Sequence, residues 1–351
     1  MDIYIYFIIT IIFFFLLDYF SPKDFNHVFE IFALFIIIGF VGLRYNTGYD
    51  YLSYVNIYES GFIDDRMEPG FIGYLNILRF FGLSAQVMFF TFALATFLFL
   101  YLGIKKYTTH HAIALLIFIL IPGLFLNTLS IIRQEFSMAV AFYAFYFLVN
   151  KKYTQYIFLM LIGTSFHYSC GIILFIHLLV FKYIHKLNTS YYFYIVVASL
   201  ILAKLNVVNL LTTLIIGGKY ASYIEGDPVS FIKLVVLNSL TVFIIFFSKS
   251  LIQKRDSNKY AIAFVVLSVF FLNVFSSLLI LTRLAYYFKI FEIVIVAELI
   301  YLFAKRYRVF ILLGFLSFYI FIFIGSLFND ISADGEGQPK MIPYKSIFSI
   351  N

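Results

Sequence analysis

Long apolar stretches follow one another through almost the whole chain, and each is interrupted only by a short polar segment. A helix that crosses a bilayer needs about 20 predominantly apolar residues, and the longest stretches reach that length. The chain is 63% hydrophobic and 12% charged, whereas soluble domains carry roughly 45–50% apolar and roughly 25% charged residues. Too few polar side chains are available to cover a water-exposed globule, so the sequence predicts an integral membrane protein.

The spacing of these stretches predicts an all-α polytopic fold, with about twelve transmembrane helices in a single domain over residues 1–351. The stretches are Ile3–Leu17, Val28–Leu43, Ala85–Ile104, Ala112–Leu126, Phe136–Val149, Tyr156–Phe166, Gly171–Phe181, Tyr191–Ile216, Phe231–Phe247, Ala261–Leu281, Leu284–Phe303 and Val309–Leu327. Two segments are expected on the external side, the loop 44–84 and a C-terminal tail over 328–351. Apolar residues at helical spacing in the loop predict an amphipathic helix at the outer interface. These residues are Phe71, Leu75, Leu78 and Phe81.

The basic residues predict the orientation in the membrane. The formal net charge is +7, and in a membrane protein such charge serves topology rather than nucleic-acid binding. Threading the runs alternately collects most of the lysines on one side, which the positive-inside rule assigns to the cytoplasm, with both termini outside. The external basic residues are mostly arginines. A planar guanidinium suits bidentate binding of phosphate or carboxylate, so these arginines need a second explanation.

The sequence predicts neither a cofactor nor a metal site. Its one cysteine, Cys170, excludes an intramolecular disulfide and a cysteine-based metal cluster. Walker, dinucleotide-binding, H-E-x-x-H and D-x-D motifs are absent from the sequence. Nucleotide-driven transport and nucleotide-sugar chemistry therefore lack their usual residues.

Arginines at the expected external ends of distant runs are candidates for an anion site. Arg44 follows the second run, Arg79 lies in the external loop, Arg133 lies in the polar segment Ser130–Glu135, and Arg283 occupies an expected turn between two runs. Each has a structural explanation as well, either as an interfacial anchor or, for Arg133, as a local ion pair with Glu135. A shared anionic ligand explains all of them with one cause.

Two residues are candidates for proton transfer. His167 ends a short run at the outer side, and histidine exchanges a proton near neutral pH. Asp50 lies in the segment after Arg44, and its carboxylate is the alternative base. A hydrogen-bonded buried histidine is the structural explanation for His167. The neighbouring tyrosines offer flat faces and hydroxyls for sugar rings, or serve as boundary packing; they are Tyr45, Tyr49, Tyr51 and Tyr54.

A series of short motifs in a fixed order resembles the EpsG family, which is similar to the Wzy-type polymerases of O-antigens, capsules and exopolysaccharides. The motifs are Arg-Tyr-x-x-Gly-x-Asp-Tyr-x-x-Tyr (44–54), Glu-Pro-Gly (68–70), Ile-Arg-Gln (132–134), Phe-His-x-Ser (166–169), Arg-Leu-Ala-x-Tyr-Phe (283–288) and Pro-Tyr-Lys (343–345). The resemblance therefore extends over most of the chain.

The resemblance implies a polytopic glycosyltransferase of the GT-C type at the outer, periplasm-facing side of the cytoplasmic membrane. It would transfer a glycan chain from one undecaprenyl-pyrophosphate carrier to the repeat unit on another. Such a donor needs no nucleotide or metal, because departure of the prenyl pyrophosphate drives the reaction. Arg133 and Arg283 would then hold the pyrophosphate, with Arg44 and Arg79 as further binding residues, and His167 or Asp50 would take the acceptor proton. A chain-length regulator is the expected protein partner.

Two other functions remain open from the residues alone. A flippase for lipid-linked oligosaccharide would use the same arginines to draw the headgroup through a cavity, although a flippase needs cations along the whole pathway. A transferase similar to the O-antigen ligases would share the donor and the chemistry but use another acceptor.

Overall fold

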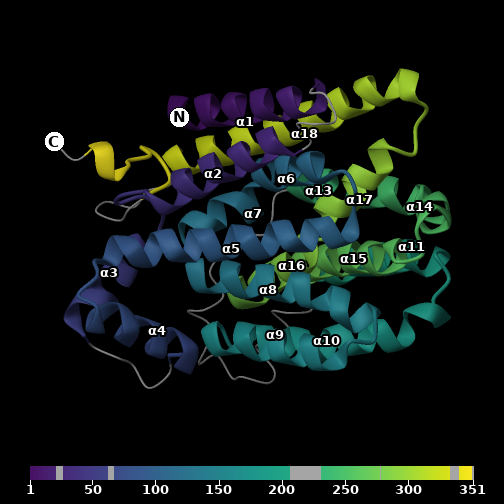
Figure 1. Ribbon diagram of the computed structural model, residues 1–351. Coiled ribbons are helices and arrows are strands. Elements are labelled where there is room, and N and C mark those ends of the chain that lie inside the picture. Colours follow the sequence, from purple (N-terminus) through teal and green to yellow (C-terminus); the bar gives the residue numbers. More distant parts are fainter. Residues whose placement is uncertain (21–26, 62–66, 206–230, 277, 333–339, 350–351) are drawn as a thin grey trace. The chain divides into compact units, whose positions relative to one another are not determined.

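The computed structural model describes residues 1–351 except 21–26, 62–66, 206–230, 277, 333–339 and 350–351. The described residues form α-helices and short 3₁₀-helices, and one isolated antiparallel β-bridge joins Arg44 to Ser346. The predicted all-α class is therefore confirmed for this part of the chain (Figure 1). Contacts divide the chain into a first unit, Met1–Ile172 with Val309–Asn351, and a second unit, Ile173–Arg308.

The first unit holds the N-terminal helices and most of the last long helix. Its elements are α1 (Asp2–Phe20), α2 (Val28–Gly42), α3 (Tyr51–Ser60), α4 (Pro69–Phe80), α5 (Ala85–Tyr107), α6 (His111–Leu120), α7 (Pro122–Phe125), η2 (Leu126–Leu129), α8 (Ile132–Val149), α9 (Tyr153–Phe166), the start of α10 (Ser169–Tyr183), most of α18 (Lys305–Ser332) and η5 (Ile347–Ser349). Helix α5 packs against α2 and α8, and α8 packs in turn against α9.

The second unit is built around α15. Its elements are the rest of α10, η3 (Ile184–Lys186), α11 (Ser190–Lys204), α13 (Phe231–Phe246), α14 (Ser248–Lys254), α15 (Asn258–Val274), α16 (Leu279–Lys289), α17 (Glu292–Ile300) and the start of α18. Helix α15 packs against α11, α13, α16 and α17. A buried amide network within this unit joins three of the helices, because Asn273 donates to Ser199 Oγ (2.8 Å) and to Asn238 Oδ1 (2.9 Å).

Several helices have the length and composition of membrane spans. Among the described residues, Ala85–Tyr107, Ser169–Lys186 and Lys305–Asp330 each suffice to cross a bilayer, and the bent pair His111–Leu120 and Pro122–Leu129 is a fourth candidate. Shorter apolar helices accompany them. Large apolar side chains stand exposed on α18, where Phe310 is 74% and Phe321 76% exposed. Apolar faces of this kind are compatible with lipid and not with water, so the chain is a membrane protein.

The predicted run Ala112–Leu126 is not one straight helix. Helix α6 ends at Leu120, and the chain turns by 86° before the segment Pro122–Leu129. Proline has no N–H to donate to the preceding turn, and its ring disfavours the helical conformation of the residue before it. Ile121 accordingly adopts an extended conformation. Because of this change in chain direction, the segment 126–131 leads into the start of α8.

The predicted run Leu284–Phe303 is also divided, into α16 and α17. At the break, the Phe291 N–H bonds the Phe288 carbonyl three residues back (3.1 Å), and the buried Lys289 pairs with Glu292. The expected external turn at Arg283 is therefore wrong. Arg283 lies inside α16, where its side chain is partly exposed.

In the described part of the loop 44–84, the chain forms two helices. Helix α4 is the predicted amphipathic helix, and its residues Phe71, Leu75 and Leu78 are buried as expected. Phe81 is 67% exposed, because the helix ends at Phe80. Helix α3, rich in tyrosine, was not predicted. Its buried face is made by Tyr51, Tyr54 and Tyr58, which recur at helical spacing.

The C-terminal segment returns to the loop after α2. The Tyr45 N–H donates to the Lys345 carbonyl (2.9 Å), and the Gly48 N–H donates to the Lys340 carbonyl (3.1 Å). The Tyr344 hydroxyl donates to the Phe40 carbonyl (2.6 Å), and its ring stacks on Phe40 at 4.2 Å. The motif Pro-Tyr-Lys therefore secures the segment that carries Arg44.

Candidate functional site

A buried glutamate at the start of α4 is the centre of the candidate site. Glu68 occupies the N-cap position in an extended conformation, and Pro69 follows at the first helical position. Proline suits that position because the N–H that it lacks has no partner within the helix. The sequence Glu-Pro-Gly thereby fixes the beginning of α4, and the Glu68 side chain is only 5% exposed.

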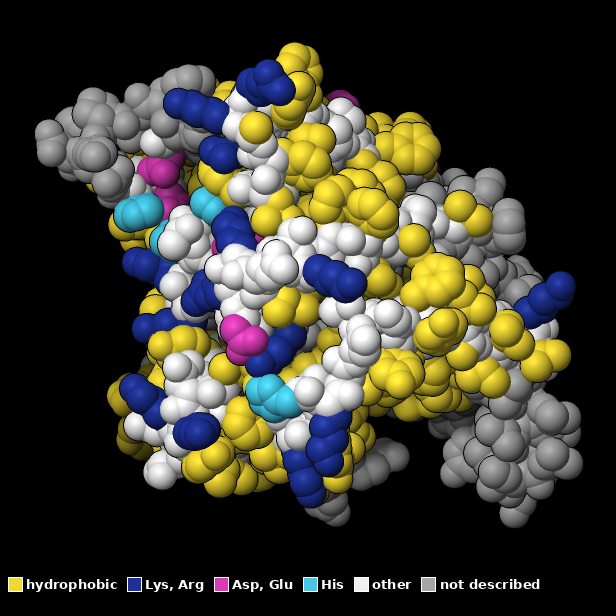
Figure 2. Space-filling view, turned by 90° about the vertical axis from the view of Figure 1, so that its right-hand side faces the viewer, with side chains coloured by type: hydrophobic (Ala, Val, Ile, Leu, Met, Phe, Trp, Pro, Cys, Tyr) yellow, Lys and Arg dark blue, Asp and Glu magenta, His cyan; other side chains and the backbone are white. Residues whose placement is uncertain are grey.

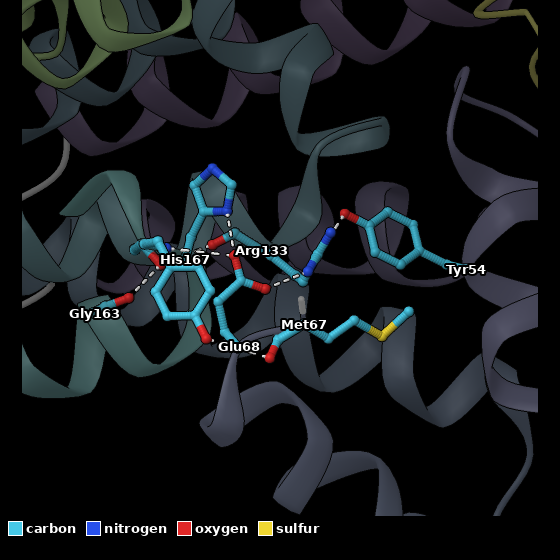
Figure 3. A network of polar contacts seen from close by, with 8 residues as sticks. Tyr54, Met67, Glu68, Arg133, Gly163 and His167 are labelled. Carbon is cyan, nitrogen blue, oxygen red and sulfur yellow. Dashed lines mark hydrogen bonds and ion pairs between the residues drawn. The ribbon is translucent and has the colours of Figure 1, made fainter. Parts of the chain in front are cut away.

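Two cationic or ionisable side chains meet this carboxylate (Figure 3). Arg133, in the first turn of α8, forms an ion pair with Glu68 Oε2 through Nη1. His167, at the C-terminal cap of α9, bonds Glu68 Oε1 through Nδ1 at 2.9 Å. The Tyr168 N–H also donates to Oε1, at 3.3 Å. The structure therefore brings together Arg133 and His167, which the sequence had proposed for one site, and adds the acid that joins them.

The environment of Glu68 keeps it ionised. Burial alone would raise its pKa, but the hydrogen bond from His167 and the charge of Arg133 outweigh this effect and hold the pKa of Glu68 below its usual value of 4.5. An ionised carboxylate accepts hydrogen bonds only, so the hydrogen between the two residues belongs to His167 Nδ1. In the neutral imidazole, the second ring nitrogen then carries a lone pair. Figure 3 shows this nitrogen pointing away from Glu68.

Aromatic rings hold the Arg133 guanidinium. Its Cζ lies 4.9 Å from the centre of the Phe71 ring and 5.7 Å from that of Tyr54, distances at which cations and rings attract each other. Nε donates to the Tyr54 hydroxyl at 3.5 Å. The side chains of Arg133 and His167 remain 23% and 29% exposed, whereas Glu68 is buried beneath them. The cationic Arg133 and the ionisable His167 are therefore accessible to a ligand, whereas Glu68 is not.

A close approach between α4 and α9 sets the geometry. A Cβ atom on Gly70 would lie 2.4 Å from Ser165 Oγ and 2.7 Å from the Ser165 carbonyl oxygen. Only glycine allows the start of α4 to lie this near the end of α9. The Gly163 carbonyl accepts the His167 N–H (2.9 Å) and the Ser137 hydroxyl (2.8 Å), which ties this end to α8.

Arg133 and Glu135 do not form the local ion pair that the sequence allowed. Side chains two positions apart in a helix point in different directions, and Arg133 turns to Glu68 instead. Glu135 is 1% exposed, and neither of its carboxylate oxygens has a hydrogen-bond partner among the described residues. It lines a small cavity, with about 10 Å³ for the centre of a water molecule, together with Arg44. That volume suits roughly one water.

Arg44 also lines this cavity and is fully buried. Its Nη1 donates to the Val41 carbonyl at 2.6 Å, and its Cζ lies 4.6 Å from the Phe89 ring centre. Nε and Nη2 have no hydrogen-bond partner in the described part of the chain. Unsatisfied donors of Arg44 and unsatisfied oxygens of Glu135 therefore belong to residues that line the same small cavity.

The remaining predicted residues occupy different positions in the two units. Arg79 caps α3, because its guanidinium donates to the Ile57 carbonyl (2.8 Å) and the Tyr58 carbonyl (3.0 Å). Asp50 precedes α3 at its N-cap position. Tyr51 is buried and stacks on Phe89 at 4.4 Å, whereas Tyr45 is 40% exposed. Arg283 belongs to the second unit.

Sequence reasoning did not select Glu68 and Glu135 as site residues. Glu68 was part of a motif and could have been found from its place directly before Pro-Gly, because an acid at a helix start is favoured by the helix dipole. Glu135 was interpreted as the ion-pair partner of Arg133, the nearest cation in the sequence, but the two side chains do not pair in the structure.

Apolar helices with exposed apolar faces, and a part-exposed arginine and histidine joined by a buried carboxylate, define a polytopic α-helical membrane protein with a polar site at helix ends. The model of the EpsG family matches residues 27–346. The chain belongs to this family of Wzy-type polysaccharide polymerase-like proteins, which confirms the resemblance found in the motifs. No curated protein and no solved structure matches the chain.

Proposed function

We propose that the protein lengthens polysaccharides by transferring a glycan from one undecaprenyl-pyrophosphate carrier to a repeat unit on a second carrier. Membership of the EpsG family supports a polysaccharide polymerase-like role. The observation that carries the specific chemistry is the Glu68 carboxylate held between His167 and Arg133. Such an arrangement combines a base and a cation within reach of one ligand.

His167 is the base in this proposal. Its second ring nitrogen takes the proton from the acceptor hydroxyl as the acceptor oxygen bonds the anomeric carbon of the donor. The imidazolium that forms is stabilised by the Glu68 carboxylate at Nδ1, which also fixes the orientation of the ring. A positioned base of this kind contributes about 10²–10⁴-fold to a rate. Asp50 is the alternative base, and it lies at the start of α3.

Arg133 serves the leaving group. The bond between the anomeric carbon and the phosphate oxygen breaks, and the prenyl diphosphate departs with the bonding electrons. Nη1 of Arg133 is engaged by Glu68, but a guanidinium has five N–H donors, so others remain for a diphosphate oxygen. Arg283 is proposed as a second residue that binds the diphosphate. Arg44 and Arg79 are proposed to position the loop after α2 and helix α3. Tyr45, Tyr51 and Tyr54 are proposed to contact the sugar rings of the substrate.

The proposed setting is the outer face of the cytoplasmic membrane, with a chain-length regulator as partner. The positive-inside rule supports this orientation, because it predicts that the C-terminal ends of α2 and α9 lie on the external side. No step requires a nucleotide or a metal at this site, since the diphosphate leaving group provides the driving force.

The test is chain lengthening by the purified protein in vesicles that contain carrier-linked repeat units and no nucleotide. We expect products of increasing length from the unchanged protein, and only single repeats from His167→Ala and Arg133→Ala. His110→Ala, outside the site, is the matched control and should lengthen chains normally. If the unchanged protein instead moves the carrier-linked unit across the bilayer without lengthening it, the flippase function is correct and the polymerase function is not.

A further inference from the structure

A second polar cluster lies at another end of the first unit. His27 precedes α2 at its N-cap position, Glu30 lies in the first turn of α2, and His111 is the first residue of α6. One ligand atom from each lies within 4.8 Å of the other two. Tyr101, near the end of α5, contacts His111 with a ring separation of 6.4 Å, whereas α4 lies by the start of α5 (Figure 1). The cluster is therefore distinct from the Glu68 site.

The contacts within the cluster leave hydrogen-bonding capacity unused. His27 Nδ1 lies 2.7 Å from Glu30 Oε2, which is a full hydrogen bond. His111 Nδ1 lies 3.8 Å from Glu30 Oε1, too far for a hydrogen bond. Both of these atoms are buried and have no hydrogen-bond partner among the described residues. Glu30 is only 1% exposed, so an acceptor and a ring nitrogen face each other in a place where leaving them unpaired is costly.

An ion between these atoms would satisfy both. Two imidazoles and one carboxylate form the donor set that zinc takes, with water as a fourth ligand. Bonds of about 2.0–2.1 Å in a tetrahedral arrangement place neighbouring ligand atoms about 3.3–3.4 Å apart. The present separations of 2.7 Å and 3.8 Å bracket that value. The third separation, between the two histidines, is within 4.8 Å, so side-chain rotations can bring the three ligand atoms around one ion. Mg²⁺ and Ca²⁺ do not fit because they select oxygen ligands.

We propose that His27, Glu30 and His111 bind a divalent cation of the zinc type, which joins the start of α2 to the start of α6. His27 is 47% exposed, so the ion has an entry path from the surface. Figure 2 shows histidine side chains next to acidic ones on the face that it draws. The Tyr101 hydroxyl also interacts with Glu30, and Asp18 and Lys105 are the nearby charged groups, since both interact with Tyr101. Spacing along the sequence did not indicate this site, because His111 lies far along the chain from the other two residues.

The proposal does not rest on the proposed function and is tested by binding alone. Chelator-treated full-length protein in detergent is titrated with Zn²⁺ in competition with a chromophoric chelator, and with Co²⁺ to record its visible absorption. We expect one Zn²⁺ per chain and the intense Co²⁺ band of a tetrahedral site. His111→Ala should weaken Zn²⁺ binding at least tenfold and remove the band, whereas His110→Ala, its neighbour in sequence, should change neither.

His27→Ala is a second variant that separates binding from folding, because His27 is 47% exposed and precedes α2 rather than lying within a helix. It should also weaken Zn²⁺ binding at least tenfold, with an unchanged helical circular dichroism spectrum. Equal Zn²⁺ affinity in the unchanged protein and in the variant that combines His27→Ala, Glu30→Gln and His111→Ala would overturn the proposal. An equal loss in His110→Ala would do the same, because it would place the ion elsewhere.

Discussion

At the scale of single residues, the partner of Arg133 decides what the site can do. A guanidinium paired with Glu135 two residues away would have left Glu68 and His167 without a cation beside them. Pairing with Glu68 instead places one carboxylate between a cation and an imidazole. The carboxylate fixes the hydrogen on His167 Nδ1 and leaves the other nitrogen for a ligand. Glu68 is thus a positioning residue, while His167 and Arg133 are the groups proposed to touch substrate.

Replacing His167 tests the base directly. His167→Ala should lower the rate of chain lengthening by about 10²–10⁴-fold, the usual contribution of a positioned base. The helix content should stay unchanged, because the side chain is 29% exposed and its backbone N–H bond to Gly163 is kept. Product length on a gel measures the effect. If His167→Ala retains full activity, His167 is not the base, and Asp50 becomes the candidate to test.

Glu68 makes stability depend on pH. Its pKa in the folded protein is below the usual value of 4.5, so its stabilisation is present above about pH 4.5 and is lost as the pH falls through the lower, folded pKa. We expect the unfolding free energy of the unchanged protein to fall more steeply below pH 5 than that of Glu68→Gln. At pH 7, Glu68→Gln should be less stable by about 1–3 kcal/mol, because Arg133 loses its partner. Detergent-solubilised protein unfolded by heat at several pH values provides the comparison. Parallel pH curves would mean that the carboxylate is not held as described.

At the scale of elements, the site depends on how closely helix ends approach one another. Glu68 begins α4, Arg133 begins α8 and His167 ends α9. Three polar groups therefore meet where backbone groups lack partners within their own helices. The 86° bend at Pro122 helps to position Arg133, because it changes the direction of the chain shortly before α8 begins. A hydrogen bond from the Tyr49 N–H to Ser130 Oγ (3.0 Å) then joins this turn to the loop that carries Arg44.

Gly70 and Gly73 offer a matched pair on α4. Gly70→Ala should destabilise the protein by about 1–3 kcal/mol and reduce chain lengthening, because the added Cβ would collide with the Ser165 backbone and move Glu68 from His167. Gly73→Ala meets nothing within 4 Å and should be neutral or up to about 1 kcal/mol more stable, as expected for alanine in a helix. Thermal unfolding and activity of both variants are compared. Equal behaviour of the two would contradict the close approach of α4 and α9.

At the scale of the whole molecule, the two ends of the chain both contact the loop that follows α2 or the helices beside it. Tyr4 on α1 donates to the Met341 carbonyl (2.9 Å), and Tyr344 packs on Phe40 of α2. Asp330, at the end of α18, accepts from the Tyr49 hydroxyl and from the Ile342 N–H (3.0 Å). The C-terminal segment is thus part of the packing around Arg44 rather than a free tail.

Removing this support should affect the distant site. Tyr344→Ala should cost about 1–3 kcal/mol, since a partly buried ring and its hydrogen bond are lost. Chain lengthening should also decrease, because the loop that carries Arg44 loses its contacts with Tyr344. Phe348→Ala is the control, because Phe348 is 78% exposed and surface changes usually stay within about 0.5 kcal/mol. Melting temperature and chain length are the measurements. An active, fully stable Tyr344→Ala variant would show that the segment has no supporting role.

The sequence by itself determined the class of this protein, because the length and apolarity of its runs leave membrane helices as the way to bury them. It also determined the family and the polar residues worth testing, since charges in such a chain are few and each needs a reason. Only the tertiary structure decided which acid pairs with Arg133, that Pro122 bends a run and that Arg283 lies inside a helix. These features depend on contacts between residues far apart in the chain, and the spacing of residues along one helix carries no information about them.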